Sequence, residues 1–83
     1  MGAIDTSIRD YYLTRTAVRS ARSAINRRGA EEMTPTSVAT LASVYLVRKG
    51  IVVELETVKA EAVSQLREAY VNQVAHRLPR RRA

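Results

Sequence analysis

The feature that most constrains the fold is the scarcity of helix-breaking residues along the chain. After Gly2, the 83 residues contain only Gly29, Pro35, Gly50 and Pro79 of the two residue types that interrupt helices most strongly. Between these points, apolar side chains recur every three or four residues, which is the periodicity of an amphipathic helix. A chain of this length forms one domain with a small core. The sequence therefore predicts an all-α fold.

The first predicted helix covers residues 6–28. Asp5 or Thr6 can cap its N-terminus. Gly29 can end it, because glycine readily adopts the left-handed conformation that follows many helices. The apolar stripe of this helix comprises Ile4, Ile8, Tyr11, Val18 and Ile25. Because Tyr11 lies on the stripe, we expect it to pack in the core.

The second predicted helix covers residues 35–78. Thr34 is a suitable N-cap, and Pro35 suits the first helical position, where no backbone N–H is required. An apolar stripe with helical spacing then continues almost to the C-terminus. The two helices would form an antiparallel helical hairpin with a short and a long arm. We assign this domain to residues 1–79 and a basic tail to residues 80–83.

Gly50 leaves the course of the second segment open. A glycine inside a helix costs about 1 kcal/mol relative to alanine, which a packed helix tolerates, so the helix over 35–78 can be continuous. The helix can instead break at Gly50, which gives a bundle of three helices. A third alternative is a β-hairpin at 44–56, since β-branched residues flank a Lys-Gly turn there. We adopt the helical hairpin and leave the break at Gly50 open.

An unusually apolar segment surrounds Gly50. Its apolar residues, taken as candidates for self-assembly, are Val44, Tyr45, Leu46, Val47, Ile51, Val52, Val53 and Leu55. In a helix they cover most of the circumference, and a helix that is apolar all round must be buried on every side. One short partner helix covers only one side. The hairpin therefore predicts that copies of the chain complete the core as a homo-oligomer.

The net charge of +6 is unevenly distributed. Residues 1–30 carry a net charge of +4, residues 31–69 carry −2, and residues 70–83 carry +4. Twelve of the fourteen cations are Arg, whose planar guanidinium suits phosphate. Two basic ends around a mildly acidic middle are typical of a protein that binds a polyanion. We expect the partner to be a nucleic acid, and specifically double-stranded DNA.

Three arginines of the first helix form the leading candidate site. Arg15, Arg19 and Arg22 are spaced by four and three residues, which stacks them on one helix face. Ser23 and Asn26 lie near the same side and can donate hydrogen bonds to phosphate oxygens. The other candidate nucleic-acid-binding residues are Arg27, Arg28, Arg80, Arg81 and Arg82.

A purely structural role for the arginine face remains an alternative. Glu54, Glu56 and Glu61 of the second segment can form ion pairs with it. Tyr45, which lies in the most apolar segment, is expected to pack in the core rather than stack on bases.

Residues that most catalytic and metal sites require are scarce. The chain has no Cys and one His, and it contains no Gly-rich phosphate loop and no nucleophile–base pair. We therefore expect no enzyme activity, cofactor, metal site or small-molecule substrate. No charge-free apolar run reaches about 18 residues, so we expect no ordinary membrane span. The N-terminal segment lacks the layout of a signal peptide, and the expected location is a virion or the cytoplasm.

The whole chain resembles the small α-helical coat proteins of rod-shaped and filamentous archaeal viruses. The resemblance rests on a short amphipathic helix, a turn at residues 29–35, and a long apolar helix between basic ends. Such coat proteins pack side by side around genomic DNA. The resemblance implies that the Arg15, Arg19 and Arg22 face or the basic tail contacts DNA, and that residues 44–53 join subunits.

Residues 34–56 are also similar to the recognition helix and wing of a winged-helix DNA-binding domain. This resemblance rests on an apolar helix end that runs into the sequence Lys49-Gly50-Ile51-Val52. It implies a dimeric transcription regulator with a β-wing and a dimerisation helix at residues 57–78. In that alternative Ser37, Thr40 and Ser43 would face DNA, and Arg48 and Lys49 would lie near the wing.

Overall fold

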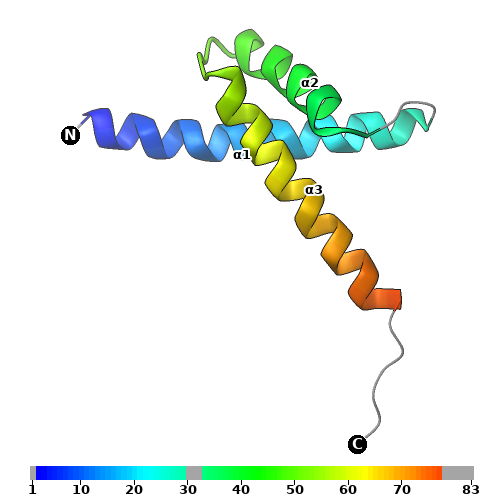
Figure 1. Ribbon diagram of the computed structural model, residues 1–83. Coiled ribbons are helices and arrows are strands. Elements are labelled where there is room, and N and C mark those ends of the chain that lie inside the picture. The colour runs from blue at the N-terminus through cyan, green and yellow to red at the C-terminus, as the bar shows by residue number, and fades with distance from the viewer. Residues whose placement is uncertain (1, 30–32, 78–83) are drawn as a thin grey trace, which may run out of the picture.

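The computed structural model describes residues 2–29 and 33–77, and these residues form three helices and no strand. The helices are α1 (Gly2–Arg28), α2 (Pro35–Arg48) and α3 (Leu55–Arg77). The all-α class predicted from the sequence is confirmed. Figure 1 shows α3 crossing α1 at a steep angle and running away from the other helices, while α2 packs beside the start of α3.

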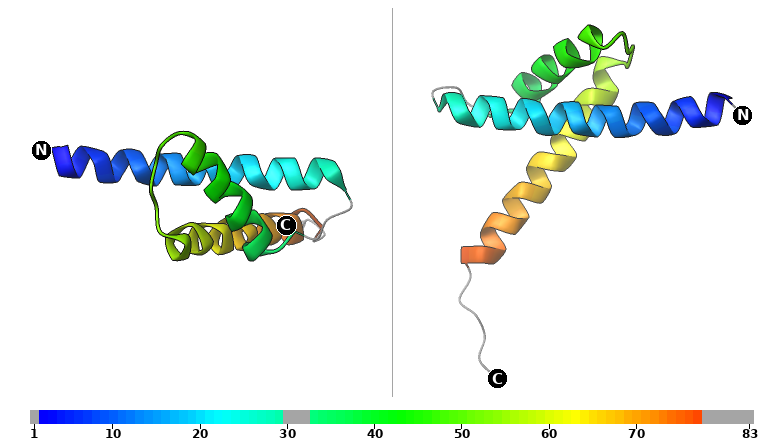
Figure 2. Two further views of the ribbon diagram at one scale, coloured as in Figure 1. Left: turned by 90° about the horizontal axis from the view of Figure 1, so that it is seen from above. Right: turned by 180° about the vertical axis from the view of Figure 1, so that it is seen from behind.

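The three helices pack against one another. Figure 2, seen from above, shows α2 lying across both α1 and α3. The molecule measures 52 × 35 × 18 Å along its principal axes, and its shortest dimension is close to two helix diameters. Both the N-terminal half of α1 and the C-terminal half of α3 extend beyond the region where the helices cross (Figure 1). This arrangement leaves long stretches of both helices without a neighbour among the described residues.

The end of α1 lies where the sequence predicts it, but the helix begins earlier than residue 6. α1 already includes Gly2 and ends at Arg28. Gly29 then adopts a φ of 70°, and its N–H donates to the carbonyl oxygen of Ile25 at 3.4 Å. Glycine takes this left-handed conformation without the steric cost of a Cβ.

The start of α2 confirms the predicted cap. The backbone N–H of Ser37 donates to Thr34 Oγ1 at 3.1 Å, and the Thr34 N–H donates to Ser37 Oγ at 3.1 Å. This reciprocal capping box satisfies two of the backbone donors that a helix start leaves unpaired. Pro35 occupies the first turn, where its missing N–H costs nothing.

The second segment breaks at Gly50, which has a φ of 75°. The Ile51 N–H donates to the carbonyl oxygen of Leu46 at 3.0 Å, and the Gly50 N–H donates to that of Val47 at 2.9 Å. These two hydrogen bonds form a Schellman motif, which ends a helix by satisfying its last carbonyl groups. Ile51 then packs against the core, as is usual for the residue after the glycine.

Two of the three interpretations of this segment are therefore wrong. A continuous helix over residues 35–78 does not form, because the Schellman motif closes α2 and residues 51–54 are not helical. The β-hairpin at 44–56 does not form either, because α2 includes residues 44–48 and residues 51–54 pair with no strand. The β-wing implied by the winged-helix resemblance is thus missing from these residues. The bundle of three helices is the arrangement observed.

All three helices contribute to the core, which is built largely from small side chains. Its buried members are Ala17, Val18, Ala21, Ile25, Val38, Ala39, Ala42, Leu46, Val58 and Ala62. Half of these are alanines, which allow helix backbones to approach closely. The largest fully buried side chains are valines, so the core buries little apolar area per residue. Hydrophobic stabilisation of one isolated copy is correspondingly modest.

Ile8 and Tyr11 of the predicted stripe on α1 do not reach this core, and the side chain of Ile4 lies outside the described ones. Ile8 is 52% exposed and Tyr11 is 54% exposed, so the predicted core position of Tyr11 is wrong. The physical reason is that the buried α1 side chains lie between Thr14 and Ile25, where the helices cross. Tyr45, by contrast, packs partly buried against the core as predicted.

Candidate nucleic-acid interface

A groove of about 800 Å³, lined by both polar and apolar side chains, lies between the C-terminal half of α1 and the projecting part of α3. Arg19, Arg22, Ser23 and Asn26 line it from α1, at spacings that keep them along one side of the helix. The facing residues of α3 include Gln65, Glu68, Tyr70, Asn72 and Gln73. The structure thus brings two of the predicted arginines together with the two predicted phosphate donors.

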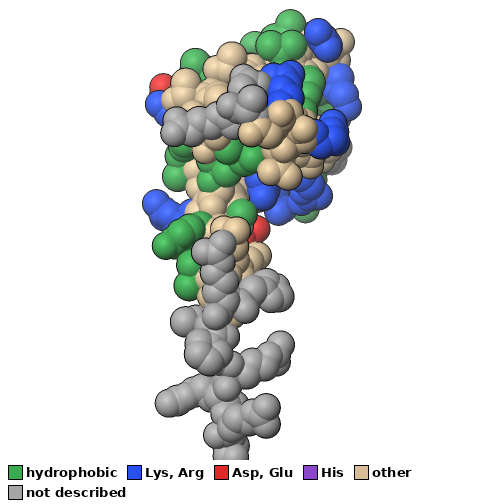
Figure 3. Space-filling view, turned by 90° about the vertical axis from the view of Figure 1, so that its right-hand side faces the viewer, with side chains coloured by type: hydrophobic (Ala, Val, Ile, Leu, Met, Phe, Trp, Pro, Cys, Tyr) green, Lys and Arg blue, Asp and Glu red, His purple; other side chains and the backbone are tan. Residues whose placement is uncertain are grey.

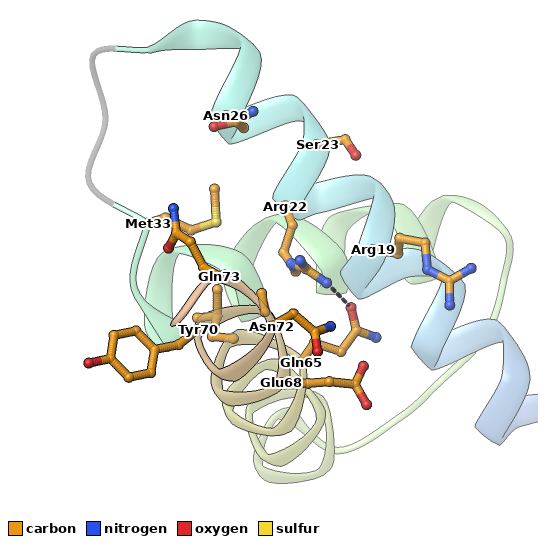
Figure 4. A pocket seen from close by; sticks show the side chains of 12 residues that line it. Arg19, Arg22, Ser23, Asn26, Met33, Gln65, Glu68, Tyr70, Asn72 and Gln73 are labelled. Carbon is orange, nitrogen blue, oxygen red and sulfur yellow. Dashed lines mark hydrogen bonds between the residues drawn. The ribbon is translucent and has the colours of Figure 1, made fainter. Parts of the chain in front are cut away.

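Arg22 lies at the base of the groove and joins its two walls. Figure 4 shows its guanidinium directed from α1 toward Gln65 on α3. Arg22 Nη1 donates to Gln65 Oε1 at 2.9 Å. The Nε of Arg22 is the one buried side-chain nitrogen or oxygen of the described residues that has no hydrogen-bond partner. A buried donor left unpaired costs about 1–3 kcal/mol, and more when it belongs to a charged group.

Gln65 is held in place by two further hydrogen bonds. Its Nε2 donates to the backbone carbonyl oxygen of Arg15 at 3.1 Å and to Glu61 Oε2 at 2.8 Å. The side chain is 6% exposed, so all three of its bonds lie in a partly desolvated site. Gln65 therefore connects α3 to α1 and orients the Arg22 guanidinium.

Arg15 is separated from the other two arginines by its own contacts. Its Nε lies 3.7 Å from Glu61 Oε2, and its Cζ lies 5.7 Å from the centre of the Tyr11 ring. It does not line the groove. The predicted face of Arg15, Arg19 and Arg22 is therefore divided. Within the part of the chain that the structure describes, Arg15 is the member of this face that forms an ion pair with a glutamate.

The charge around the groove is mainly positive. Among its lining residues, the cations Arg19 and Arg22 are accompanied by one acid, Glu68. Figure 3, which looks onto the end of the molecule where α1 finishes, shows Lys and Arg side chains gathered along one side. Arg27 and Arg28 lie exposed in the last turn of α1, directly after Asn26 of the groove. The tail arginines Arg80, Arg81 and Arg82 lie outside the described residues.

The candidate self-assembly residues around Gly50 divide into two groups. Leu46 is 2% exposed and belongs to the core of the chain itself, and the partly buried Tyr45, Ile51 and Val53 pack against that core. These four side chains pack within one chain because the break at Gly50 folds the segment back onto the core, and their role in subunit contacts stays a prediction. The residues that remain exposed are Val44, Val47, Val52 and Leu55.

The sequence did not predict the three amide side chains that contribute to the site from α3. The amides Asn72 and Gln73 face the arginines only because α3 crosses α1, and nothing in their local sequence predicts that crossing. Gln65 offered a signal: it follows Val58 by seven positions and Ala62 by three, which places a polar residue on the buried side of its helix.

Several other kinds of site are not found in the described part of the chain. No three side chains of His, Cys, Asp and Glu lie close enough together there to hold a metal ion. No helix within residues 2–29 and 33–77 is both long and apolar enough to cross a membrane. Comparison with protein families, curated proteins and solved structures gives no significant match to this chain.

Proposed function

We propose that this protein is a non-enzymatic, self-associating helical subunit that contacts a nucleic-acid backbone without base specificity. The observation that carries the proposal is the groove in which Arg19 and Arg22 face the amides of α3. A viral coat or nucleoprotein subunit that packages double-stranded DNA is the concrete form of the proposal. Its location would be a virion or the cytoplasm.

The groove has the donors that a phosphate requires. Arg22 makes one hydrogen bond, to Gln65, and its Nε is left without a partner. An anion in the groove would give this guanidinium further acceptors and would reduce the repulsion between Arg19 and Arg22. Ser23 and Asn26 supply neutral donors on the same wall. Contacts of this kind hold a backbone in place and carry no sequence information directly.

Exposed apolar side chains support the self-association part of the proposal. Val47 is 70% exposed and Val52 is 93% exposed, beside a core whose largest fully buried residues are valines. The half of α3 beyond the crossing lines the groove on one side, and no other helix covers it from the other side in Figure 1. Contacts between copies would bury this surface and add to the stability of a small core.

Titrations of two short DNA duplexes of unrelated sequence over a range of salt concentrations test the backbone contact. We expect equal affinity for both duplexes and a steep loss of affinity with added salt, because backbone binding releases condensed counterions. A preference for one duplex that persists at high salt would contradict the proposal, and so would the absence of binding at low salt.

A further inference from the structure

The helix α3 has two opposite faces of different character. One face, which includes Val58, Ala62 and Gln65, is buried against the other helices. The opposite face carries Ala60, Val63, Ser64, Arg67 and Val71, and these residues line a shallow groove of about 480 Å³ along the helix together with Glu68. Their spacing of three or four residues makes a straight stripe, like the seam of a helix that pairs with another helix.

This stripe is uncovered in one copy of the chain. Val63 is 36% exposed and Val71 is 56% exposed. All the residues that line the shallow groove come from α3 itself, so α1 and α2 contribute no wall to it. The view in Figure 1 agrees, because α3 runs away from the other helices over this stretch.

We propose that the stripe pairs with the same stripe of a second copy, with the two α3 helices antiparallel. This proposal rests on the self-association proposed above and specifies its interface. A two-fold axis between Ser64 and Arg67 sets Ala60 of one copy opposite Val71 of the other, and Ser64 opposite Arg67. Each larger side chain then meets a smaller one, which allows the helices to approach closely.

Charge complementarity favours pairing between two copies of the stripe. Arg67 and Glu68 are both exposed, and neither forms an ion pair with a described residue. In the antiparallel pair, Arg67 of one copy is displaced along the helix axis by only about 6 Å from Glu68 of the other, a distance that an Arg side chain spans. The two-fold axis repeats this ion pair. The sizes of the side chains select the antiparallel pair, because a parallel pair in register would set Val71 level with Val71 and Arg67 level with Arg67, so that larger side chains would meet each other.

The pairing leaves the cationic groove free. The groove that holds Arg19 and Arg22 is lined by the side of α3 where Gln65 and Ala69 lie, and the stripe is on the other side. Glu68 lies at the edge between the two surfaces and lines both. A pair joined through α3 therefore presents two cationic grooves on opposite outer sides. Such a unit can hold two stretches of backbone, or join neighbouring units along one polymer.

Charge reversal at the two ion-pairing positions tests the interface, with association measured by analytical ultracentrifugation in the absence of nucleic acid. Arg67→Glu makes both positions negative and Glu68→Arg makes both positive, so each variant should dimerise about tenfold more weakly than the wild type. Mixing the two variants should restore dimers, because the heterodimer regains both opposite-charge pairs. The double variant R67E/E68R should dimerise like the wild type.

Arg48→Glu is the matched control, because Arg48 is an exposed arginine in α2 and lies outside the stripe. It should leave dimerisation within about twofold of the wild type. Far-UV circular dichroism verifies that all the variants keep their helices, as expected for changes at exposed positions.

The outcomes separate this interface from the broader proposal. If the wild type dimerises but the single variants dimerise equally well, or their mixture is no tighter than either variant alone, the α3 interface is overturned and self-association through another surface stands. If the wild type stays monomeric at every concentration, both the interface and self-association are overturned. Nucleic-acid binding through the Arg19 and Arg22 groove is measured independently of either result.

Discussion

Arg22 Nη1 donates a hydrogen bond of 2.9 Å to Gln65 Oε1, and this bond joins two helices across 43 positions of the chain. The same Gln65 also donates to the Arg15 carbonyl oxygen and to Glu61. One buried amide therefore links α3 to α1 at the base of the cationic groove. Stability and the geometry of the candidate site depend on the same side chain.

Replacing this amide should destabilise the fold. Gln65→Ala removes three hydrogen bonds and leaves the partly buried Arg22 and Glu61 groups without this partner, so we expect a loss of about 1–3 kcal/mol in the free energy of unfolding. Urea denaturation followed by circular dichroism measures it. Gln73→Ala, at an exposed position of the same helix, should change the free energy of unfolding by less than about 0.5 kcal/mol. Equal midpoints for the two variants would contradict the role of Gln65.

The adjacent residues Leu46 and Val47 should respond to truncation very differently. Leu46 is 2% exposed and Val47 is 70% exposed. Leu46→Ala opens a cavity in a small core and should cost about 2–4 kcal/mol. Val47→Ala should cost less than about 0.5 kcal/mol, and thermal melts at low protein concentration compare the two. A similar loss for both would mean that α2 presents a different face to the core.

The capping box of α2 should contribute measurably to stability. Thr34→Ala removes the acceptor for the Ser37 N–H, and we expect a loss of about 1 kcal/mol. Thr36→Ala is the matched control, because this threonine is exposed two positions further along the chain. If denaturant midpoints show that both substitutions cost the same, the cap contributes no more than an ordinary surface threonine.

Gly50 should be required for its backbone conformation and not for space. No atom lies within 4 Å of where a Cβ would be, yet the φ of 75° is strained for a residue with a side chain. Gly50→Ala should therefore cost about 1 kcal/mol, and Gly50→Asn should cost less, since Asn tolerates this region better. An alanine variant that is as stable as the wild type and more helical by circular dichroism would indicate that α2 and α3 can merge.

The local signals in the sequence were sufficient to place the end of α1 and the start of α2. Thr34 and Pro35 define a start through backbone chemistry alone, and Gly29 defines an end in the same way. Gly50 was ambiguous because a single glycine is compatible with a tolerated helical position, a turn between strands and a Schellman motif. The Schellman motif forms because Ile51 folds back and packs against the core near Leu46. This packing depends on contacts with α1, which the local sequence does not reveal.

The long-range part of the site could not be predicted in the same way. Arg19, Arg22, Ser23 and Asn26 share one side of α1, and helical spacing alone indicated that. Which arginine lines the groove and which pairs with Glu61 depends on how α3 crosses α1, and small side chains such as Ala21 and Ala62 set that crossing. The sequence also did not predict that Leu46 is buried while Val47 is exposed, because apolar residues continue on both sides of Gly50 and do not reveal the break between the helices.

The comparison that tests the central claim most directly is the salt-dependent affinity for a short DNA duplex of Arg19→Gln against Arg48→Gln. Both substitutions remove one exposed arginine, but only Arg19 lines the groove between α1 and α3. We expect Arg19→Gln to weaken binding and to reduce the slope of log affinity against log salt by about 1, while Arg48→Gln stays close to the wild type. Equal effects of the two substitutions, or no effect of either, would contradict the assignment of this groove to the nucleic-acid backbone.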